Sequence, residues 1–484
     1  MKLYEEALVL GERKQVEISA HEIEKQEYYT REVRRINDEQ REKTGRVRKY
    51  IVLTYGCQMN EHDSEKMNFM LSQMGYSPSD SIREADIVIF NTCAVRENAE
   101  LKVYGKLGHM KSIKRIKPDV KVMVCGCMMQ QQHVIDEIKK SHRHVDAVFG
   151  THNYHKLPEF IYESYGSEKT IVDVWNIDGQ VVEGLRSIRK FDTKAYVNIT
   201  YGCNNFCTYC IVPYTRGRER SRKPQDIISE IEMLAKDGVK EVTLLGQNVN
   251  SYGKTLEREY SFAQLIRAVN EIDGIERIRF MTSHPKDLSD ELIYAIRDCD
   301  KVCNYLHLPV QSGSSRVLRK MNRHYTKEQY LELVAKIRKE IPDIAFTTDI
   351  IVGFPGETEE DFQDTLDVVR QVRYDSAFTF IYSKRSGTPA AEMPDQIDEG
   401  IKHERLERLM SLVNDISAQI NETYRGETVE VLVEGPSKTD KTRLMGRTPQ
   451  SKLVNFEGSE ELVGKLVNVR IDDPKTFSLC GIVL

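Results

Sequence analysis

The sequence is poor in cysteine and has no long apolar run. Ten cysteines among 484 residues are too few for a disulfide scaffold. No apolar stretch approaches the roughly 18 residues that a membrane-spanning helix needs, and the amino terminus lacks an apolar secretory segment. We therefore expect a cytoplasmic protein, in a reducing compartment and without a membrane partner.

A surplus of positive charge is also missing. The formal net charge is −5, with 30% charged and 40% hydrophobic residues. These proportions are typical of globular proteins, and the length predicts several domains. Net charge does not point to nucleic acid, so any RNA site has to come from local basic patches.

The most informative motif is the C-x3-C-x2-C triplet of Cys203, Cys207 and Cys210. Three thiolates suit a 4Fe-4S cluster and leave one iron without a protein ligand, free to bind a small molecule. Zinc is the alternative, although zinc prefers four protein ligands and paired C-x2-C spacings. The triplet therefore predicts a cluster that takes part in chemistry.

A second set of cysteines is spread along the chain. Cys57, Cys93 and Cys127 each follow a short apolar run that reads as a buried parallel strand. Loops at the carboxyl ends of parallel strands converge on one crevice, so these thiols are expected to meet as a second three-thiolate site. Three unrelated buried cysteines are the alternative.

These motifs resemble those of known enzymes. The triplet resembles the defining motif of the radical S-adenosylmethionine (SAM) superfamily. Three segments around Cys57, Cys93 and Cys127 resemble the amino-terminal motifs of the methylthiotransferases. The resemblance to this family runs from about residue 49 to residue 484. The segments are Gly56-Cys57-Gln58-Met59-Asn60, Asn91-Thr92-Cys93-Ala94-Val95-Arg96 and Gly126-Cys127-Met128.

Periodicity and this resemblance together predict a multidomain α/β chain. Residues 1–47 form a charged extension, either a solvated helix or a disordered arm, which we expect to be dispensable. Residues 48–160 predict a small doubly wound α/β domain that carries the auxiliary cluster, and residues 161–190 a linker. Residues 191–423 predict a partial (β/α)6 radical SAM barrel, and residues 424–484 an OB-like TRAM β-barrel that binds RNA.

The elements of the barrel follow from apolar runs and turn signals. Helices are expected near residues 224–236, 326–339 and 398–424. The expected strands cover residues 195–199, 241–245, 277–281, 305–309, 346–351 and 378–382.

The resemblance implies two 4Fe-4S clusters, one on each set of cysteines. Cys125 and Cys127 are both candidates for the third auxiliary ligand, and the family pattern favours Cys127. The resemblance also places SAM contacts at the strand ends of the barrel, where glycines allow close approach to a ligand. These are Tyr209, Gly246, Gln247, Ser283, Gln311 and Gly353.

Two arginine-rich segments are candidates for binding RNA phosphates. One is the loop after the triplet, with Arg216, Arg218, Arg220 and Arg222. The other is the patch around Arg443 and Arg447, for which a solvated face is the alternative.

The resemblance implies methylthiolation of C2 in N6-isopentenyladenosine at position 37 of tRNA. SAM has two roles, as radical source and as methyl donor. The expected partners are a tRNA anticodon stem-loop, an electron donor such as flavodoxin or ferredoxin, and a sulfur source, and we expect a monomer. The alternatives are threonylcarbamoyladenosine in tRNA, an aspartate of a ribosomal protein, and a non-catalytic iron–sulfur RNA-binding protein.

Overall fold

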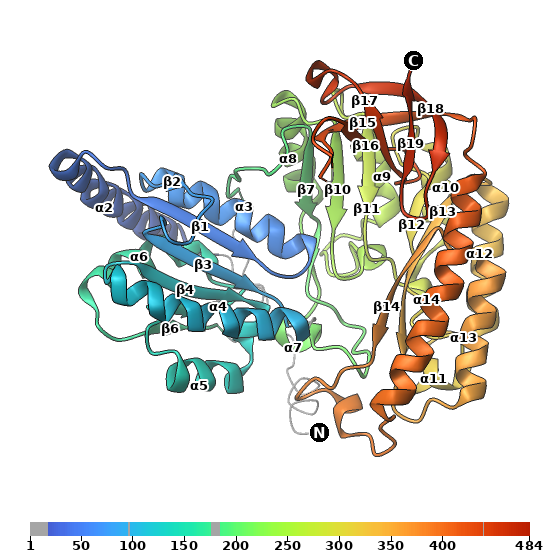
Figure 1. Cartoon of the computed structure of the whole chain (residues 1–484), viewed down its shortest axis with the longest axis horizontal. Helices are drawn as coiled ribbons and strands as arrows, with labels where there is room; N and C mark the ends of the chain where they lie inside the picture. Colours follow the sequence, from blue (N-terminus) through green and yellow to red (C-terminus); the bar gives the residue numbers. More distant parts are fainter. Residues whose placement is uncertain (1–17, 95–96, 176–183, 439) are drawn as a thin grey trace. The chain divides into compact units, whose positions relative to one another are not determined.

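The computed structural model describes residues 18–94, 97–175, 184–438 and 440–484 (Figure 1). The chain divides into two compact units. Unit 1 comprises residues 1–190, 201–204 and 210–220, and unit 2 comprises residues 191–200, 205–209 and 221–484. The start of the predicted extension, Val95 and Arg96 of the second cysteine motif and part of the predicted linker lie outside the described residues. The predicted domain boundaries stay predictions.

Unit 1 is built on a parallel sheet of six strands in the order β2-β1-β3-β4-β5-β6. Successive residues of β3 point to opposite faces: Ile87 and Ile89 join one core, and Val88 and Phe90 join the other. Burial on both faces is what a doubly wound sheet requires. The strands are β1 (Lys49–Thr54), β2 (Ser77–Pro78), β3 (Ile87–Thr92), β4 (Lys121–Gly126), β5 (Ala147–Phe149) and β6 (Ile171–Asp173).

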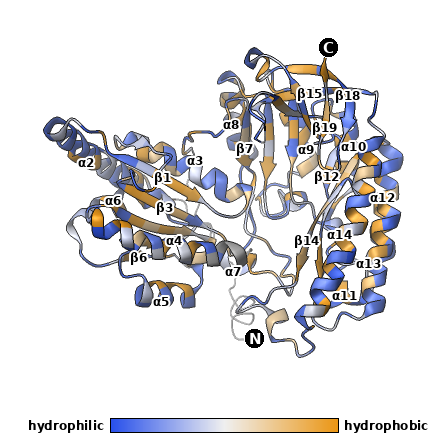
Figure 2. Ribbon diagram, in the orientation of Figure 1, coloured by the Kyte–Doolittle hydropathy of each residue, from blue (hydrophilic) through white to orange (hydrophobic). Residues whose placement is uncertain are grey.

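Helices cover both faces of this sheet. On one face α3 (Gln58–Gln73) and α6 (Leu157–Gly166) contribute core residues, and on the other α4 (Glu97–Ile116) and α5 (Gln132–Ser141) do so. Figure 2 shows the contrast between the hydrophobic strands of the sheet and the hydrophilic α2 (Ala20–Thr44).

The predicted extension contains that helix, and α2 belongs to the fold of unit 1. Val33 is fully buried in the core that α3 and α6 share. Lys25 Nζ lies 2.6 Å from Glu159 Oε1 of α6, and the Asn37 side chain donates to the Met74 carbonyl at 2.8 Å. The expectation of a dispensable extension is therefore not supported for residues 20–44, because removing them would uncover part of this core.

Unit 2 begins with six parallel strands in two three-stranded sheets, ordered β7-β10-β11 and β12-β13-β14. A parallel bridge between Ile278 and Val302 links the first sheet to the segment before β12. This is the predicted partial barrel. Its strands are β7 (Lys194–Asn198), β10 (Glu241–Leu245), β11 (Arg277–Phe280), β12 (Tyr305–His307), β13 (Ala345–Val352) and β14 (Ser376–Ile381).

The helices of the barrel alternate with these strands, as predicted. Three of them match the expected ranges within about two residues: α8 (Pro224–Lys236), α12 (Lys327–Glu340) and α14 (Glu399–Glu422). The others are α9 (Phe262–Asn270), α10 (Asp290–Asp298), α11 (Ser315–Lys320) and α13 (Glu359–Val372). Along the described ranges of the chain, no helix is long and apolar enough to cross a bilayer.

The carboxyl-terminal strands close into a five-stranded barrel of order β15-β16-β17-β19-β18 with its own apolar core. The strands are β15 (Thr428–Pro436), β16 (Leu444–Arg447), β17 (Leu453–Glu457), β18 (Leu466–Pro474) and β19 (Leu479–Val483). The small barrel is not isolated from the rest of unit 2. The buried Arg279 of β11 donates to the carbonyls of Thr448 and Pro449 and to Glu241 of β10.

Glu241 holds Arg279 in the contact between the two barrels by accepting a hydrogen bond from its guanidinium group. Burial alone would raise the pKa of Glu241, but the guanidinium of Arg279 and the ammonium of Lys194 lower it to about 2. The carboxylate therefore stays charged at neutral pH. Removing the small barrel would strip Arg279 of its carbonyl acceptors, so the larger barrel is not expected to survive truncation unchanged.

The place of α2 in the core leads to a stability prediction. Val33→Ala should lower the free energy of unfolding by about 2 kcal/mol, because it leaves a cavity under α2. Ile23→Ala on the same helix should cost less than about 0.5 kcal/mol, since Ile23 is 47% exposed. Denaturant unfolding of the full chain measures both. If both variants lowered the free energy of unfolding by equal and small amounts, α2 would be a dispensable extension after all.

Candidate functional site

Three cysteine loops meet at one edge of the sheet in unit 1. Cys57 follows β1 and precedes α3, Cys93 follows β3, and Cys127 follows β4. These strands are neighbours in the order β1-β3-β4, so their carboxyl ends lie side by side. The Oδ1 atom of Asn60 lies 3.5 Å from Cys57 Sγ and 3.9 Å from Cys127 Sγ. The structure therefore brings the loops together as the sequence predicted.

The glycine of two motifs makes this convergence possible. A Cβ atom on Gly56 would lie 2.6 Å from the Cβ of Cys93, and a Cβ on Gly126 would lie 2.3 Å from the Thr92 carbonyl oxygen. Both glycines also have positive φ angles, of 131° and 97°. Only glycine fits at these positions, because any side chain would push neighbouring cysteine loops apart.

A buried amide pair ties the same loops together. Asn60 donates to the Thr92 carbonyl at 2.8 Å, and Asn91 donates to the Asn60 carbonyl at 2.8 Å and to Ser64 at 2.9 Å. Both asparagines are at most 1% exposed. Such a satisfied buried network fixes loop positions. These two residues belong to the quoted motifs, but no role was predicted for either of them.

Arg216 completes the polar surroundings of Cys127. Its Nε donates to Cys127 Sγ at 3.0 Å, and its Nη2 donates to Asn60 Oδ1 at 2.9 Å and lies 3.3 Å from Asp63 Oδ2. Burial disfavours the cation, but Cys127 and Asp63 outweigh it and raise the pKa of Arg216. Burial raises the pKa of the Cys127 thiol to about 12, while Arg216 acts in the opposite direction.

These residues fit a metal–sulfur group. A cation and a hydrogen bond directed at a cysteine sulfur suit a ligand that carries negative charge. Cys125, the rival ligand, points into the core beside Met67, with 3.9 Å between the sulfurs. Its placement supports the choice of Cys127. The His, Cys, Asp and Glu side chains of the described residues contain no group of three already gathered as a metal site, so the ligand assignment stays a prediction.

The other triplet lies in the loop after β7 and the short strand β8 (Thr200–Tyr201). Cys203 and Cys207 are buried, and Cys210 is half-buried. Arg323, which is 5% exposed, donates to Cys207 Sγ at 3.6 Å and to the Pro309 carbonyl at 2.9 Å. A buried arginine therefore faces one cysteine sulfur in each triplet. The sequence reasoning missed Arg323, which has no motif around it.

The predicted SAM contacts follow the barrel strands closely. Gly246 and Gln247 come directly after β10, and Gly353 comes directly after β13. Gln311 has a φ of 66° and pairs with Ile350 in a parallel bridge. Tyr209 packs against the cluster of Val317, Met321, Phe354, Tyr382 and Ala390. All six residues thus lie in unit 2, near the carboxyl ends of its strands.

Two neighbouring residues that follow β11, Ser283 and His284, each have a buried polar atom without a partner among the described residues. These atoms are Ser283 Oγ and His284 Nε2. The Nδ1 of His284 accepts from the Lys286 amide at 3.3 Å, so its proton is assigned to Nε2. Burial, helped by Arg323, lowers the pKa of His284 far below its usual range, so the ring is neutral. Buried polar groups are normally paired, and a ligand with hydroxyl and amino groups fits these two.

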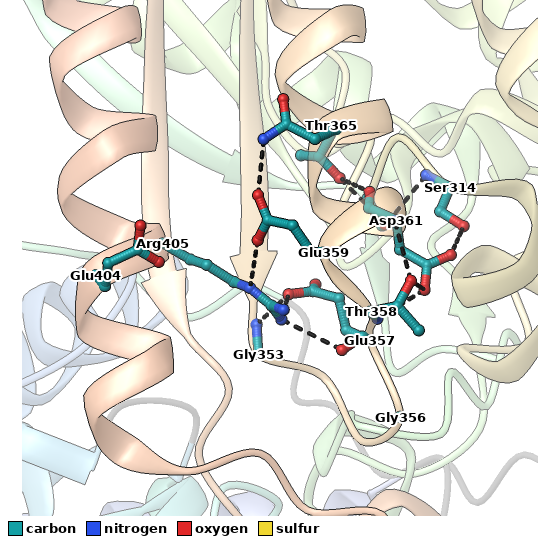
Figure 3. Close-up of polar contacts among 12 residues, drawn as sticks. Ser314, Gly353, Gly356, Glu357, Thr358, Glu359, Asp361, Thr365, Glu404 and Arg405 are labelled. Atoms are coloured by element: carbon teal, nitrogen blue, oxygen red, sulfur yellow. Dashed lines mark hydrogen bonds and ion pairs between the residues drawn. The ribbon is translucent and has the colours of Figure 1, made fainter.

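Gly353 has a structural reason for being glycine besides the one expected. A Cβ on Gly353 would lie 2.3 Å from Cγ of Lys402 in α14, so the packing of this helix also requires glycine, and the SAM contact stays a prediction. Figure 3 shows how the following turn is held: the Gly353 amide and Arg405 both donate to Glu357 Oε1, at 2.9 and 2.7 Å. Burial raises the pKa of Glu357 to about 7, against the effect of Arg405.

Two of the arginines predicted to contact phosphate have internal partners instead. Arg216 lies against Cys127, as described. Arg222 is 6% exposed, donates to the Asn198 carbonyl at 2.7 Å and pairs with Glu230 at 2.7 Å. The sequence reasoning was wrong about these two, because arginine spacing does not reveal which way a loop turns. Arg218 and Arg220 are half-buried, and their role stays a prediction.

The arginines of the small barrel are more accessible. The side chains of Arg443 and Arg447 are 39% and 38% exposed. Arg443 lies 3.8 Å from Asp440, and Arg447 lies 3.4 Å from Glu434. Both guanidinium groups are therefore partly exposed and paired, and their contact with phosphate stays a prediction.

Three family models match successive parts of the chain. The uncharacterized protein family UPF0004 matches residues 49–150, the Radical SAM superfamily residues 197–369 and the TRAM domain residues 422–484. Among solved structures, the radical SAM methyltransferase TsrM from Kitasatospora setae, with tryptophan and a SAM analogue, has a TM-score of 0.51. It is 14% identical, and the match covers 81% of this chain and 79% of that one, so this likeness shows the fold alone.

Curated relatives are much more similar. The tRNA-2-methylthio-N(6)-dimethylallyladenosine synthase of Clostridioides difficile (strain 630) is 62% identical over 98% of this chain and 100% of its own. The protein of the same name from Alkaliphilus oremlandii is 60% identical over 98% and 100%. That from Acetivibrio thermocellus is 59% identical over 98% of each chain. The chain therefore belongs to the radical SAM family of tRNA-2-methylthio-N(6)-dimethylallyladenosine synthases.

Proposed function

We propose that this protein converts N6-isopentenyladenosine at position 37 of tRNA to its 2-methylthio derivative. The observation that carries the proposal is 62% identity over 98% of the chain to a relative whose name states this product. The dimethylallyl group of that name is the isopentenyl group. The two cysteine sets and their arginines supply the matching chemistry within the chain.

The unreactive C2–H bond explains why cofactors are needed. Cys203, Cys207 and Cys210 would hold a 4Fe-4S cluster, which would supply the electron for the reductive cleavage of SAM. Cys57, Cys93 and Cys127 would hold an auxiliary cluster, which would supply the sulfur, and a second SAM would supply its methyl group. Two clusters per chain is thus part of the proposal.

The protein residues position these groups. Ser283 and the neutral His284 offer a hydroxyl and an N–H donor to the ribose or methionine part of SAM, because both atoms are buried and have no partner among the described residues. Arg323 and Arg216 stabilise negative charge on Cys207 and Cys127. Asn60 and Asn91 hold the auxiliary loops in register, which keeps the sulfur ligands at fixed positions.

The relatives' names favour this substrate over threonylcarbamoyladenosine and over a ribosomal protein aspartate. Mass spectrometry of nucleosides from cells that lack the protein tests the choice. Loss of the 2-methylthio group from isopentenyladenosine, restored by the intact gene but not by a Cys203→Ala copy, supports the proposal. Loss from threonylcarbamoyladenosine, or an unchanged profile, overturns it. We further propose a cytoplasmic monomer that takes electrons from flavodoxin or ferredoxin and sulfur from a separate donor.

The two cysteine sets should be separable by substitution. Cys203→Ala should abolish formation of 5′-deoxyadenosine from SAM, whereas Cys57→Ala should spare it and stop methylthiolation. The triple change of Cys203, Cys207 and Cys210 to Ala should leave about half the iron after anaerobic reconstitution, because each set binds independently. Cys125→Ala is the matched control and should keep its iron. Loss of the auxiliary cluster in Cys125→Ala, with retention in Cys127→Ala, would reverse the ligand choice.

Arg216 should act on the auxiliary site through hydrogen bonds. Arg216→Gln removes a cation beside Cys127, so the reduction potential of the auxiliary cluster should become more negative, and activity should fall about tenfold or more. Arg216→Lys should restore part of both. Arg218→Gln, in the same loop, should leave the potential unchanged. The measurement is a redox titration followed by electron paramagnetic resonance, and equal potentials for all variants would exclude this role.

The small barrel should contribute to tRNA binding through phosphates. Arg443→Gln with Arg447→Gln should weaken binding and flatten its dependence on salt, with a slope change of up to about 1.8 for two lost contacts. The base that is modified should not change, because phosphate contacts position RNA without specifying it. Lys465→Gln, on the same barrel outside the patch, serves as control. Filter binding across salt concentrations measures this, and equal slopes would make the arginine patch a solvated face.

A further inference from the structure

Unit 1 carries a groove that the proposed chemistry does not use. It has a volume of about 470 Å³ and is lined by Tyr55, Lys102, Gly105, Lys106 and His109. Four of these residues come from α4, at spacings of three and four that place them on one side of the helix. Lys102, Gly105, Lys106 and His109 are all exposed.

The acidic residues of this helix lie at its start. α4 contains Glu97 and Glu100 in its first turns, whereas residues 101–116 contain five lysines and arginines and no aspartate or glutamate. Lys114, away from the groove, is neutralised by Asp146 at 2.6 Å. Lys102 and Lys106, by contrast, are exposed, and neither has an ion pair among the side chains that the structure describes. Exposed cations of this kind attract a polyanion from outside the protein.

The glycine in the groove has no internal explanation. Gly105 lies within α4, where glycine is a poor helix former, and a Cβ atom there would meet nothing within 4 Å. No packing against the described residues demands its lack of a side chain. A glycine between two exposed lysines leaves the helix surface open to close approach by a backbone.

The groove adjoins the auxiliary cysteine loops. Tyr55 ends the strand segment that leads into Gly56 and Cys57, and α4 follows the loop of Cys93. The Tyr55 end of the groove is therefore two residues along the chain from Cys57, which is proposed to hold the transferred sulfur. The tyrosine ring, half-buried at this end, offers a stacking or hydrogen-bonding surface to a nucleotide.

We propose that the groove formed by Tyr55 and the α4 residues Lys102, Gly105, Lys106 and His109 binds the phosphate backbone of the tRNA anticodon arm. This inference rests on the proposed function and adds a docking surface to it. Uncompensated charge, an open helix surface and closeness to the sulfur loops all favour RNA as the occupant rather than a protein.

The charge test uses the full reconstituted chain and an anticodon stem-loop RNA as probe. Lys102→Gln with Lys106→Gln should weaken binding at least about fivefold at moderate salt and lower the salt slope by about 1.4 to 1.8. The control, Lys111→Gln with Arg115→Gln, makes the same change of charge at exposed positions of α4 outside the groove. SAM cleavage without RNA should be the same in all three proteins.

A second pair of variants separates binding from folding. Gly105→Gln and Gly108→Gln should both raise the melting temperature, since each replaces an exposed helical glycine, but only Gly105→Gln fills the groove and should weaken RNA binding. Equal RNA binding by the groove variants and their controls would overturn the proposal that the groove binds RNA, while leaving the proposed function intact. Failure of the unmodified protein to bind the stem-loop would overturn both.

Discussion

Cysteines that are distant in the sequence can share one site only where the backbones of their loops touch. In unit 1 this contact depends on Gly56 and Gly126, whose missing side chains leave room for the Cys93 loop and the Thr92 carbonyl. Parallel strands bring the three loops to one edge, but they do not by themselves bring the sulfurs together. The glycines set the approach and the buried Asn60 amide holds it. Every role proposed for the auxiliary cysteines requires this close packing.

Burial of positive charge beside sulfur is the second shared feature of the two cysteine sets. Arg216 and Arg323 are each almost fully buried, a cost that is offset by Asp63 for one and by the Pro309 carbonyl for the other. Neither arginine belongs to a cysteine motif. Because hydrogen bonds to sulfur tune iron–sulfur potentials, each arginine is placed to adjust the cluster that we propose on its own set of cysteines.

The sequence predicted those parts of the fold that local patterns determine. The helix at residues 224–236 begins at Pro224, which suits a first turn, and its amphipathic pattern gives both of its ends correctly. The apolar runs before Cys57, Cys93 and Cys127 are strands, since parallel strands are buried on both faces. The order of strands in the sheet then accounts for the convergence of the cysteine loops.

What the sequence could not supply is the direction in which a polar side chain points. α2 looks like a solvated helix, because a single fully buried residue, Val33, anchors it among charged neighbours. Arg216 and Arg222 look like phosphate ligands, yet tertiary packing turns both inward, where internal acceptors satisfy them. Because the net charge of the chain is −5, each arginine with internal partners leaves fewer cations to attract RNA. Arginines held inside the fold cannot attract RNA, so our proposals place the RNA contacts at exposed cations instead, on the small barrel and at Lys102 and Lys106 of α4.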